Sequence, residues 1–335
     1  MDVLTDAITA MRTGRPHSKR HVLASPWGMH FRDDYGAAFH VVLQGSCWLL
    51  PPSDAAPVQL GLGDVVFLQN GAPHGLADHP DTPTRPFDPT RQDGLPAGDG
   101  TATILLCGAY VLDATRPHPL LSAVPPMIHL PARLGQRDSL RAAVGMLGDE
   151  LSTPRPGSTG VIAAFIDKLL LYILRTWFEE QAQEVPPAGW ALALQDPAVG
   201  GALQAIHDAP ERGWTVADLA ATAGLSRAAF AGRFTTLVGC PPMKYLTWWR
   251  MTTAARLLRE SNQPLATVAR QVGYGSDVAF ALAFKREYGV TPGRYRNEPH
   301  PTDLEGPPAA QHNALGIESP LGRRNHAKAS TQTNH

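Results

Sequence analysis

The chain has few cysteines, little charge and no long hydrophobic run. Charged residues make up 18% of its 335 residues and hydrophobic residues 43%, which argues for a folded protein rather than a disordered chain or a coiled coil. The three cysteines, Cys47, Cys107 and Cys240, are too few and too scattered for a disulfide framework. The sequence has no apolar run of membrane-spanning length, and its N-terminus does not read as a secretory signal. We therefore expect a cytoplasmic protein with no membrane partner.

The formal net charge of −1 conceals an uneven distribution along the chain. Residues 1–199 carry 14 Lys and Arg against 20 Asp and Glu, whereas residues 200–297 carry 12 against 6. A basic segment behind an acidic one is typical of a nucleic-acid-binding module attached to a domain of another kind. The length predicts two folded domains and a tail.

Residues 1–130 are predicted to form an antiparallel β-domain. Apolar residues at helical spacing first predict a short amphipathic helix within residues 1–20. Short apolar runs between glycines and prolines then predict strands over Phe39–Leu43, Cys47–Leu50, Val65–Leu68 and Thr103–Cys107. Asp78–Gly100 is rich in Pro, Asp, Gly and Thr and is predicted to be a long mobile loop.

Residues 131–195 are predicted to be a helical linker, with helices over 138–152 and 158–182. The second helix carries a broad apolar stripe, made of Val161, Ile162, Phe165, Leu169, Tyr172, Ile173, Thr176 and Trp177. Such a stripe must be buried, either against the chain's own domains or against a second subunit in a homodimer. Residues 298–335 have no periodicity and are predicted to be a disordered tail.

The basic segment contains an internal repeat, in residues 215–246 and again in residues 265–296. Pairs of landmarks keep the same spacing in both copies: Phe230 and Phe234 match Phe280 and Phe284, and a Gly, a Pro and a Tyr follow at equal intervals. The two copies therefore predict the same local structure twice.

Each copy predicts two helices joined by a tight turn. The first helix (216–223 or 265–272) ends at a glycine, and Ser226 or Ser276 is the N-cap of the second. The phenylalanines bury one face of that second helix and leave the outer face free for a DNA major groove. A helix over 247–260, spanning roughly 20 Å, joins the copies. A purely structural helical bundle is the alternative interpretation.

The segment GYGSDVAFALAFKREYGVTPGRYR resembles the most specific signature of the AraC/XylS family of transcription regulators. The resemblance covers residues 200–297 and implies an all-α, double helix-turn-helix domain that binds double-stranded DNA, with RNA polymerase as a further partner. It places base-edge positions at Arg227, Ala228, Ala231, Gly232, Asp277, Val278, Ala281 and Leu282. Phosphate contacts are expected from Arg227, Arg233, Lys244, Lys285 and Arg286.

The predicted DNA-binding set also includes the two serine N-caps. Several base-edge positions depart from the long polar residues frequent in the family. Ala, Val and Leu can contact a thymine methyl group but make no bidentate hydrogen bonds. Asp277 either accepts from a cytosine amine or caps its helix.

The segments FHVVLQGSCWLL (39–50) and GDVVFLQNGAPHGLAD (63–78) resemble the cupin β-barrel, and more narrowly the cupin-type sensor domain in front of some AraC-type regulators. The resemblance implies a multidomain α+β chain with an effector pocket that includes His40, His74 and Cys107. Metal-binding cupins offer two His and a Glu from the first motif, but only His40 is present here. The two histidines either bind a metal ion, completed by His30, Cys107 or an effector, or are hydrogen-bonded pocket residues.

The sequence thus predicts a one-component regulator that is not an enzyme. Its effector is a small molecule or an oxidant; an oxidant would act on Cys47 or Cys107, although both lie in apolar strand segments typical of core residues. The alternative is a metal-dependent cupin enzyme fused to a helical bundle. No cofactor is predicted apart from a metal ion in the barrel.

Overall fold

The computed structural model describes most of the chain up to residue 297. The described residues are 2–11, 17–32, 36–52, 55–88, 102–110, 118–132, 138–153, 155–183 and 189–297. The predicted tail, 298–335, and most of the second half of the predicted loop at 78–100 lie outside them. Among the described residues, no helix is long and apolar enough to cross a membrane.

The N-terminal domain contains two five-stranded sheets. The first has the strand order β1 (His17–Leu23), β9 (Thr103–Tyr110), β3 (Ala37–Gln44), β6 (Val65–Leu68) and β10 (Met127–Leu130). The second has the order β5 (Val58–Leu60), β4 (Cys47–Leu50), β7 (His74–Ala77), β2 (Gly28–Phe31) and β8 (Arg85–Pro86). The pairs are antiparallel except β2 with β8. The predicted antiparallel β-domain is confirmed, and its four predicted strands all form.

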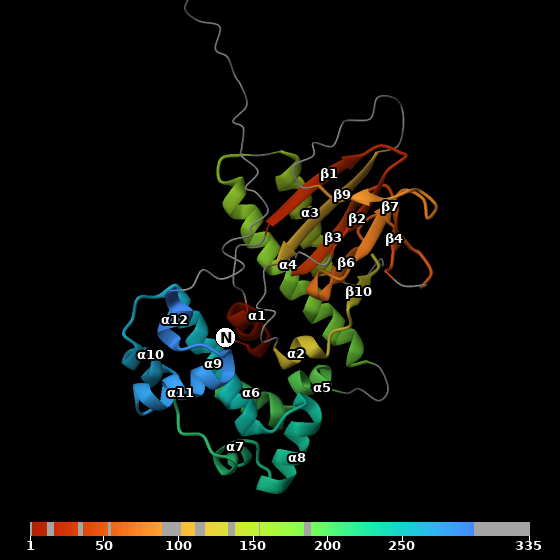
Figure 1. The fold of residues 1–335 in the computed structure, drawn as a ribbon. Helices are drawn as coiled ribbons and strands as arrows, with labels where there is room; N and C mark the ends of the chain where they lie inside the picture. Colours follow the sequence, from red (N-terminus) through yellow and green to blue (C-terminus); the bar gives the residue numbers. More distant parts are fainter. Residues whose placement is uncertain are drawn as a thin grey trace, which may run out of the picture.

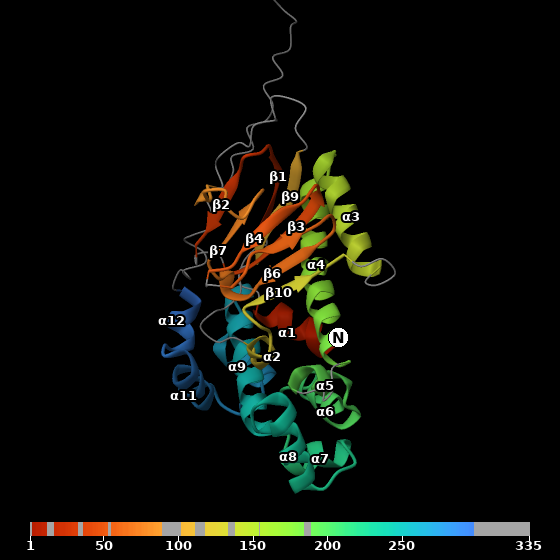
Figure 2. The ribbon, with the colours of Figure 1, turned by 90° about the vertical axis from the view of Figure 1, so that its right-hand side faces the viewer.

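Both faces of the first sheet are buried, because it is the middle of three layers. Along β3, Ala38 and Val42 join the core between the two sheets, whereas Phe39 and Val41 join a second core on the helical side. Alternate residues of a strand point to opposite faces, so a strand covered on both sides is apolar throughout. Figure 2 shows α3 (Asp138–Ser152) and α4 (Ser158–Gln181) on the side of this sheet away from β2 and β7.

The helices of the N-terminal half partly match their predicted bounds. α3 and α4 confirm the two helices predicted for the linker. The predicted helix within residues 1–20 is shorter, because α1 (Val3–Met11) ends before His17, where the chain pairs with β9 instead. Most of the apolar stripe of α4 packs inside the chain, and the Tyr110 hydroxyl donates to the Ile166 carbonyl at 2.6 Å.

The C-terminal half is helical. It contains α5 (Gly189–Gln195), α6 (Pro197–Asp208), α7 (Val216–Thr222), α8 (Arg227–Val238), α9 (Pro242–Glu260), α10 (Leu265–Gln271), α11 (Asp277–Tyr288) and α12 (Pro292–Asn297). The joining helix predicted over 247–260 is longer than expected, because α9 begins at Pro242, where a proline is accommodated in the first turn. At 1.5 Å per residue its 19 residues span about 28 Å.

One hydrophobic core continues from the N-terminal domain into the C-terminal half. It includes α1, α2 (Pro119–Ser122) and α4, and also the buried faces of α6, α7 and α8 and the first half of α9. A separate core joins the second half of α9 to α10 and α11. In Figure 1, α9 accordingly lies between α1 and the helices at the lower left.

A chain of buried polar groups crosses this junction. His118 Nδ1, at the N-cap of α2, accepts from the Leu120 amide at 2.9 Å, so its Nε2 carries the proton and donates to the Tyr245 hydroxyl at 3.1 Å. The Tyr245 hydroxyl in turn donates to His207 Nε2 at 2.8 Å, and His207 Nδ1 donates to the Asp6 carboxylate at 3.3 Å. Burial lowers the pKa of both histidines, which keeps them neutral. Each hydrogen bond from His118 through Tyr245 and His207 to Asp6 therefore has one defined donor and one defined acceptor.

We expect Tyr245→Phe to lower the free energy of unfolding by about 2 kcal/mol, because it leaves a buried donor on His118 and a buried acceptor on His207 unpaired. Tyr172→Phe is the control, since Tyr172 is only partly buried and no hydrogen bond from a described residue holds its hydroxyl. Urea denaturation of both variants measures the difference. Equal stability of Tyr245→Phe and the unmodified chain would show that the chain of hydrogen bonds contributes nothing.

Candidate nucleic-acid interface and interior of the N-terminal domain

The first repeat folds as two capped helices. Thr215 and Asp218 form a reciprocal capping box at the start of α7, which ends before Gly224 at φ +66°. The Ser226 hydroxyl accepts from the Ala229 amide at 3.3 Å and begins α8. Gly239, at φ +84°, ends α8 in the left-handed region that glycine adopts without strain.

The second repeat has the same construction. α10 ends before Gly273 at φ +80°, the Ser276 hydroxyl accepts from the Ala279 amide at 3.1 Å, and Gly289 at φ +75° ends α11. Both serine N-caps were predicted and both are confirmed. The Asp277 carboxylate accepts from the Val278 amide at 2.9 Å, as in the predicted capping role. The repeat is therefore structural as well as sequential.

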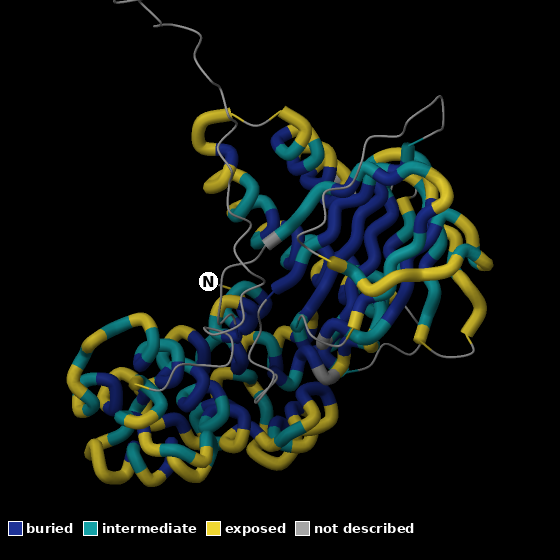
Figure 3. The backbone as a smooth tube through the Cα atoms, turned by 45° about the horizontal axis from the view of Figure 1, so that its top comes forward, coloured by how far each residue is buried: buried dark blue, intermediate teal, exposed yellow. Residues whose placement is uncertain are grey.

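The outer faces of α8 and α11 are open to solvent. Their inner faces are fixed by four phenylalanines with no exposed surface, Phe230, Phe234, Phe280 and Phe284. Of the twelve predicted DNA-binding residues, only Ala231 and Ala281 are half-buried; the other ten are exposed, namely Ser226, Arg227, Ala228, Gly232, Arg233, Ser276, Asp277, Val278, Leu282 and Lys285. In Figure 3, exposed turns lie along the outer side of the C-terminal half.

The two outer faces differ in chemistry. Ala228 and Gly232 on α8 correspond to Val278 and Leu282 on α11, which are 66% and 67% exposed. One turn apart on the same helix, these two large apolar side chains form a solvent-facing pair without a hydrophobic neighbour to cover it.

Arg233 departs from its predicted role. Its guanidinium is bound to Asp196, which also caps α6 through the amides of Ala198 and Val199. Burial would raise the pKa of Asp196, but the Val199 amide and the Arg233 guanidinium outweigh it and hold that pKa below its usual value. Arg233 therefore fixes α8 against α6, and we no longer assign it a phosphate contact.

Inside the N-terminal domain, the structure brings the three predicted pocket residues together. His40 and His74 lie with their Nε2 atoms 2.7 Å apart, and Cys107 is the cross-strand partner of His40 on β9. His74 Nδ1 donates to the Ala72 carbonyl at 2.7 Å, so its neutral ring accepts at Nε2 from His40. Burial lowers the pKa of His40 well below its ordinary value and that of His74 to about 4. The pair is a hydrogen-bonded couple of neutral imidazoles.

These residues do not fit the predicted metal ion. Each Nε2 is used in the bond between the rings, and His74 Nδ1 is bonded to the Ala72 carbonyl. Of these two rings, only the buried Nδ1 of His40 has no partner among the described residues. The described parts of the chain bring no three His, Cys, Asp or Glu side chains together around one point. His30 and Cys107, the proposed completing ligands, do not make such a group.

The cysteines lack the features of oxidant sensors. Burial, with Asp64 nearby, raises the pKa of Cys47 to about 12, and burial also raises that of Cys240. Cys107 is 5% exposed within the core between the sheets. A redox-sensing cysteine needs an accessible thiolate, so the thiols favour the core interpretation.

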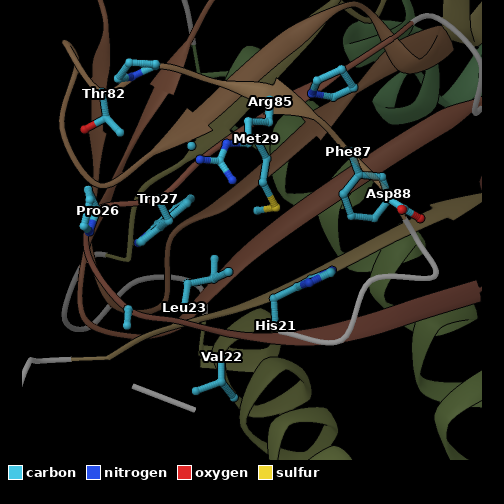
Figure 4. A pocket seen from close by; sticks show the side chains of 14 residues that line it. His21, Val22, Leu23, Pro26, Trp27, Met29, Thr82, Arg85, Phe87 and Asp88 are labelled. Atoms are coloured by element: carbon cyan, nitrogen blue, oxygen red, sulfur yellow. The ribbon is translucent and has the colours of Figure 1, made fainter. Parts of the chain in front are cut away.

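A cavity of about 380 Å³ opens beside this interior, between β1, the segment 24–29 and the segment 82–88. Figure 4 shows Trp27, Met29, Arg85 and Phe87 around it. None of the predicted pocket residues lines it. An aromatic stack leads inward from its wall: Phe87 lies on Phe31 with ring centroids 4.7 Å apart, and Phe31 lies on His74 at the same separation.

Sequence comparison agrees with both halves of this architecture. The profile of the Cupin family matches residues 2–179, and a helix-turn-helix domain profile matches residues 219–298. AraC-like transcription regulators from Streptomyces lividans and Streptomyces antibioticus are 36% and 34% identical, over 89% and 90% of this chain and 99% and 100% of their own length. The HTH-type transcriptional regulator MtrA of Neisseria gonorrhoeae is 30% identical over 89% of this chain and 99% of its own.

The chain belongs to the AraC family of transcription regulators. Its C-terminal half is accordingly a DNA-binding double helix-turn-helix domain behind a cupin-type domain, and it is a regulator rather than the alternative metal-dependent enzyme.

In this AraC-family regulator, Arg250 connects the two helix-turn-helix units. From α9, its Nε donates to the Pro210 carbonyl at 2.7 Å and its Nη2 to the Arg212 carbonyl at 2.8 Å, both in the loop that enters the first unit. A Cβ at Gly273, in the turn of the second unit, would lie 2.6 Å from Nη2 and 2.9 Å from the Glu211 carbonyl. The turn of the second unit therefore fits closely against the loop of the first.

We expect Gly273→Ala to lower the free energy of unfolding by about 3 kcal/mol, since it adds a steric clash to the strain of alanine at positive φ. Gly224→Ala is the matched control: it occupies the same place in the first unit, also at positive φ, but a Cβ there meets nothing within 4 Å. It should cost about 1 kcal/mol. Chemical denaturation compares the two, and equal losses would contradict the close fit.

Proposed function

We propose that this chain is a one-component regulator in which α8 and α11 read two successive major-groove segments and the cupin-type domain senses a small molecule. The observation that carries the DNA-reading half is the repetition itself. Two helices with the same caps and the same buried phenylalanines present the same four exposed positions: Ser226, Arg227, Ala228 and Gly232 on α8 match Ser276, Asp277, Val278 and Leu282 on α11. Between them, α9 spans about 28 Å, comparable with the roughly 34 Å of one DNA turn.

Phosphate contacts come from exposed cations around the two reading helices. Arg227 begins α8, Lys244 lies in the first turn of α9, and Lys285 lies on the last turns of α11; all three are exposed. Arg286 is exposed as well, although its Nε lies 3.4 Å from Glu287. Such contacts position the protein on the duplex and make binding depend on salt.

Sequence readout by α11 rests on apolar contacts. Val278 and Leu282 have no hydrogen-bonding atoms in their side chains, so they discriminate bases by contact with the C5 methyl group of thymine. At the matching positions of α8, Ala228 and Gly232 are too small to reach as far; they bring the backbone and Arg227 closer to the groove. The two halves of the recognised site therefore differ in chemistry.

The remaining partners follow from this role. The neutral His40–His74 pair, Cys107 and the neighbouring cavity support a small-molecule effector in the N-terminal domain over an oxidant. RNA polymerase is the partner through which a promoter-bound regulator acts, in the cytoplasm where the DNA is. Exposed Met146 and Val161, at 51% and 40%, place apolar surface on α3 and α4 where a second copy can pack.

The experiment that tests DNA reading is selection of bound duplexes from a random library by the full chain, followed by titration of the selected site at several salt concentrations. We expect Arg227→Glu to weaken binding about ten-fold or more. The slope of log affinity against log salt concentration should become shallower by about one, because one phosphate contact is lost. Arg141→Glu, an exposed arginine on α3, is the matched control and should bind like the unmodified chain. No sequence enrichment, or equal effects of both variants, would contradict the proposal.

Replacing thymine by deoxyuridine in the selected site tests the apolar readout, because it removes only the methyl group. Each lost methyl contact should weaken binding about four-fold, from about 0.8 kcal/mol per buried methylene-sized group. The double variant Val278→Ala/Leu282→Ala should lose most of this preference for thymine, because alanine reaches less far towards the methyl group. Leu62→Ala, which removes a 66% exposed leucine of the N-terminal domain, should keep the preference for thymine. Equal affinity of the unmodified chain for the thymine and deoxyuridine duplexes would contradict the apolar readout.

A further inference from the structure

The cavity of the N-terminal domain lies where both sheets end. β1 is the last strand of the first sheet and β8 the last strand of the second, so the space between the sheets opens at this edge. The cavity is lined from β1 by His21, Val22 and Leu23, and from the other side by the segments 24–29 and 82–88. Its volume of about 380 Å³ would hold about a dozen waters, at roughly 30 Å³ each. It is the size of a single-ring compound with a short substituent.

About half of the cavity wall is apolar, and part of it is flat. Leu23 and Trp27 are 8% exposed and belong to the core between the sheets, with Met29 and Phe87 packed against that core. Prolines at 26, 83 and 86 add further apolar surface. Figure 4 shows the rings of Trp27 and Phe87 on different sides of the space. Aromatic walls of this kind favour a flat apolar ligand.

Arg85 supplies a positive charge to the cavity wall. It lies on β8, whose backbone pairs with β2 so that Arg85 is in register with Met29, and no described residue forms a hydrogen bond or an ion pair with its guanidinium. Figure 4 shows its guanidinium beside Met29, whereas the carboxylate of Asp88 lies beyond Phe87. Asp88 already has an interaction partner. An arginine over apolar surface, without a carboxylate of its own, is suited to a bidentate bond with a ligand carboxylate.

A glycine fixes the position of this arginine. A Cβ at Gly28 would lie 2.7 Å from the Pro83 carbonyl and 3.2 Å from the Thr84 Cα, so only glycine lets the segment before Arg85 approach β2 this closely. That approach allows β8 to pair with β2 and brings Arg85 over the cavity. The backbone that carries Arg85 is therefore a built feature of the fold, and Arg85 itself is an exposed side chain that lines the cavity.

We propose that this cavity binds a small carboxylic acid with a flat, apolar body, whose ring lies against Trp27 and Phe87 and whose carboxylate is bound by Arg85. The inference rests on the proposed effector-sensing role and names the class of effector. The stack from Phe87 through Phe31 to His74 connects the bound ring with the buried imidazole pair. Movement of Phe87 on binding would therefore displace Phe31 and, through it, the ring of His74.

Isothermal titration of the full chain with benzoate and phenylacetate, each compared with its neutral amide, tests the proposal. The acids should bind at least ten-fold more tightly than the amides, a ratio typical of one charged hydrogen-bonding pair. Arg85→Gln should remove that preference and leave amide binding unchanged. Arg141→Gln, an exposed arginine remote from the cavity on α3, should retain it. Met29→Trp should fill the space and abolish binding of acids and amides alike.

Equal affinity for acid and amide, a preference that survives Arg85→Gln, or no heat with any of the four compounds at millimolar concentration would overturn the proposal. The same samples are tested for binding to the DNA site selected by the full chain. A chain that binds its DNA but no acid leaves DNA reading intact and removes this effector class. A chain that binds the acids but selects no DNA removes the DNA-reading role and leaves the cavity assignment standing.

Discussion

Continuity of the hydrophobic core through α9 is the constraint on which the arrangement of this protein depends. The first half of that helix is buried with the N-terminal domain and the first helix-turn-helix unit, and the second half with the second unit. α9 therefore connects the N-terminal domain with both helix-turn-helix units. The buried hydrogen bonds of Tyr245 fix the relative position of the two halves. Apolar packing alone tolerates sliding of one surface over the other, whereas aligned donors and acceptors do not.

The two helix-turn-helix units are held in different ways. The first shares its core with the cupin-type domain and has the additional ion pair between Arg233 and Asp196. The second is joined through α9 and through the contact of Gly273 with Arg250 and Glu211. The orientation of α11 relative to α8 therefore depends on fewer contacts than the attachment of α8 to the rest of the molecule. Under the proposed effector role, the second unit is the part whose placement changes at the smaller cost.

The sequence contained the local structure of the C-terminal half because glycine turns, serine caps and paired phenylalanines act over a few residues. Apolar runs in the sequence also located four of the strands, and the resemblance to known families placed His40 and His74 in one pocket. The sequence did not contain the ion pair of Arg233 with Asp196, 37 residues apart, or the contacts of Tyr245 with His118 and His207. Such pairs are set by how distant elements pack. The cavity was missed for the same reason, since its walls come from segments about 60 residues apart and its only local sign was the aromatic residues.

The unequal outer faces of α8 and α11 give the protein a polarity on DNA. A symmetric dimer binds a palindrome and has no preferred direction along the duplex. In the proposed reading by α8 and α11, a single chain presents small residues at one end and a valine–leucine pair at the other, which gives its recognised element a distinguishable left and right half. Inverting that element turns the whole molecule around, and the cupin-type domain then faces the opposite way along the promoter. The orientation of the element, and not only its position, thus determines which neighbours the regulator can contact.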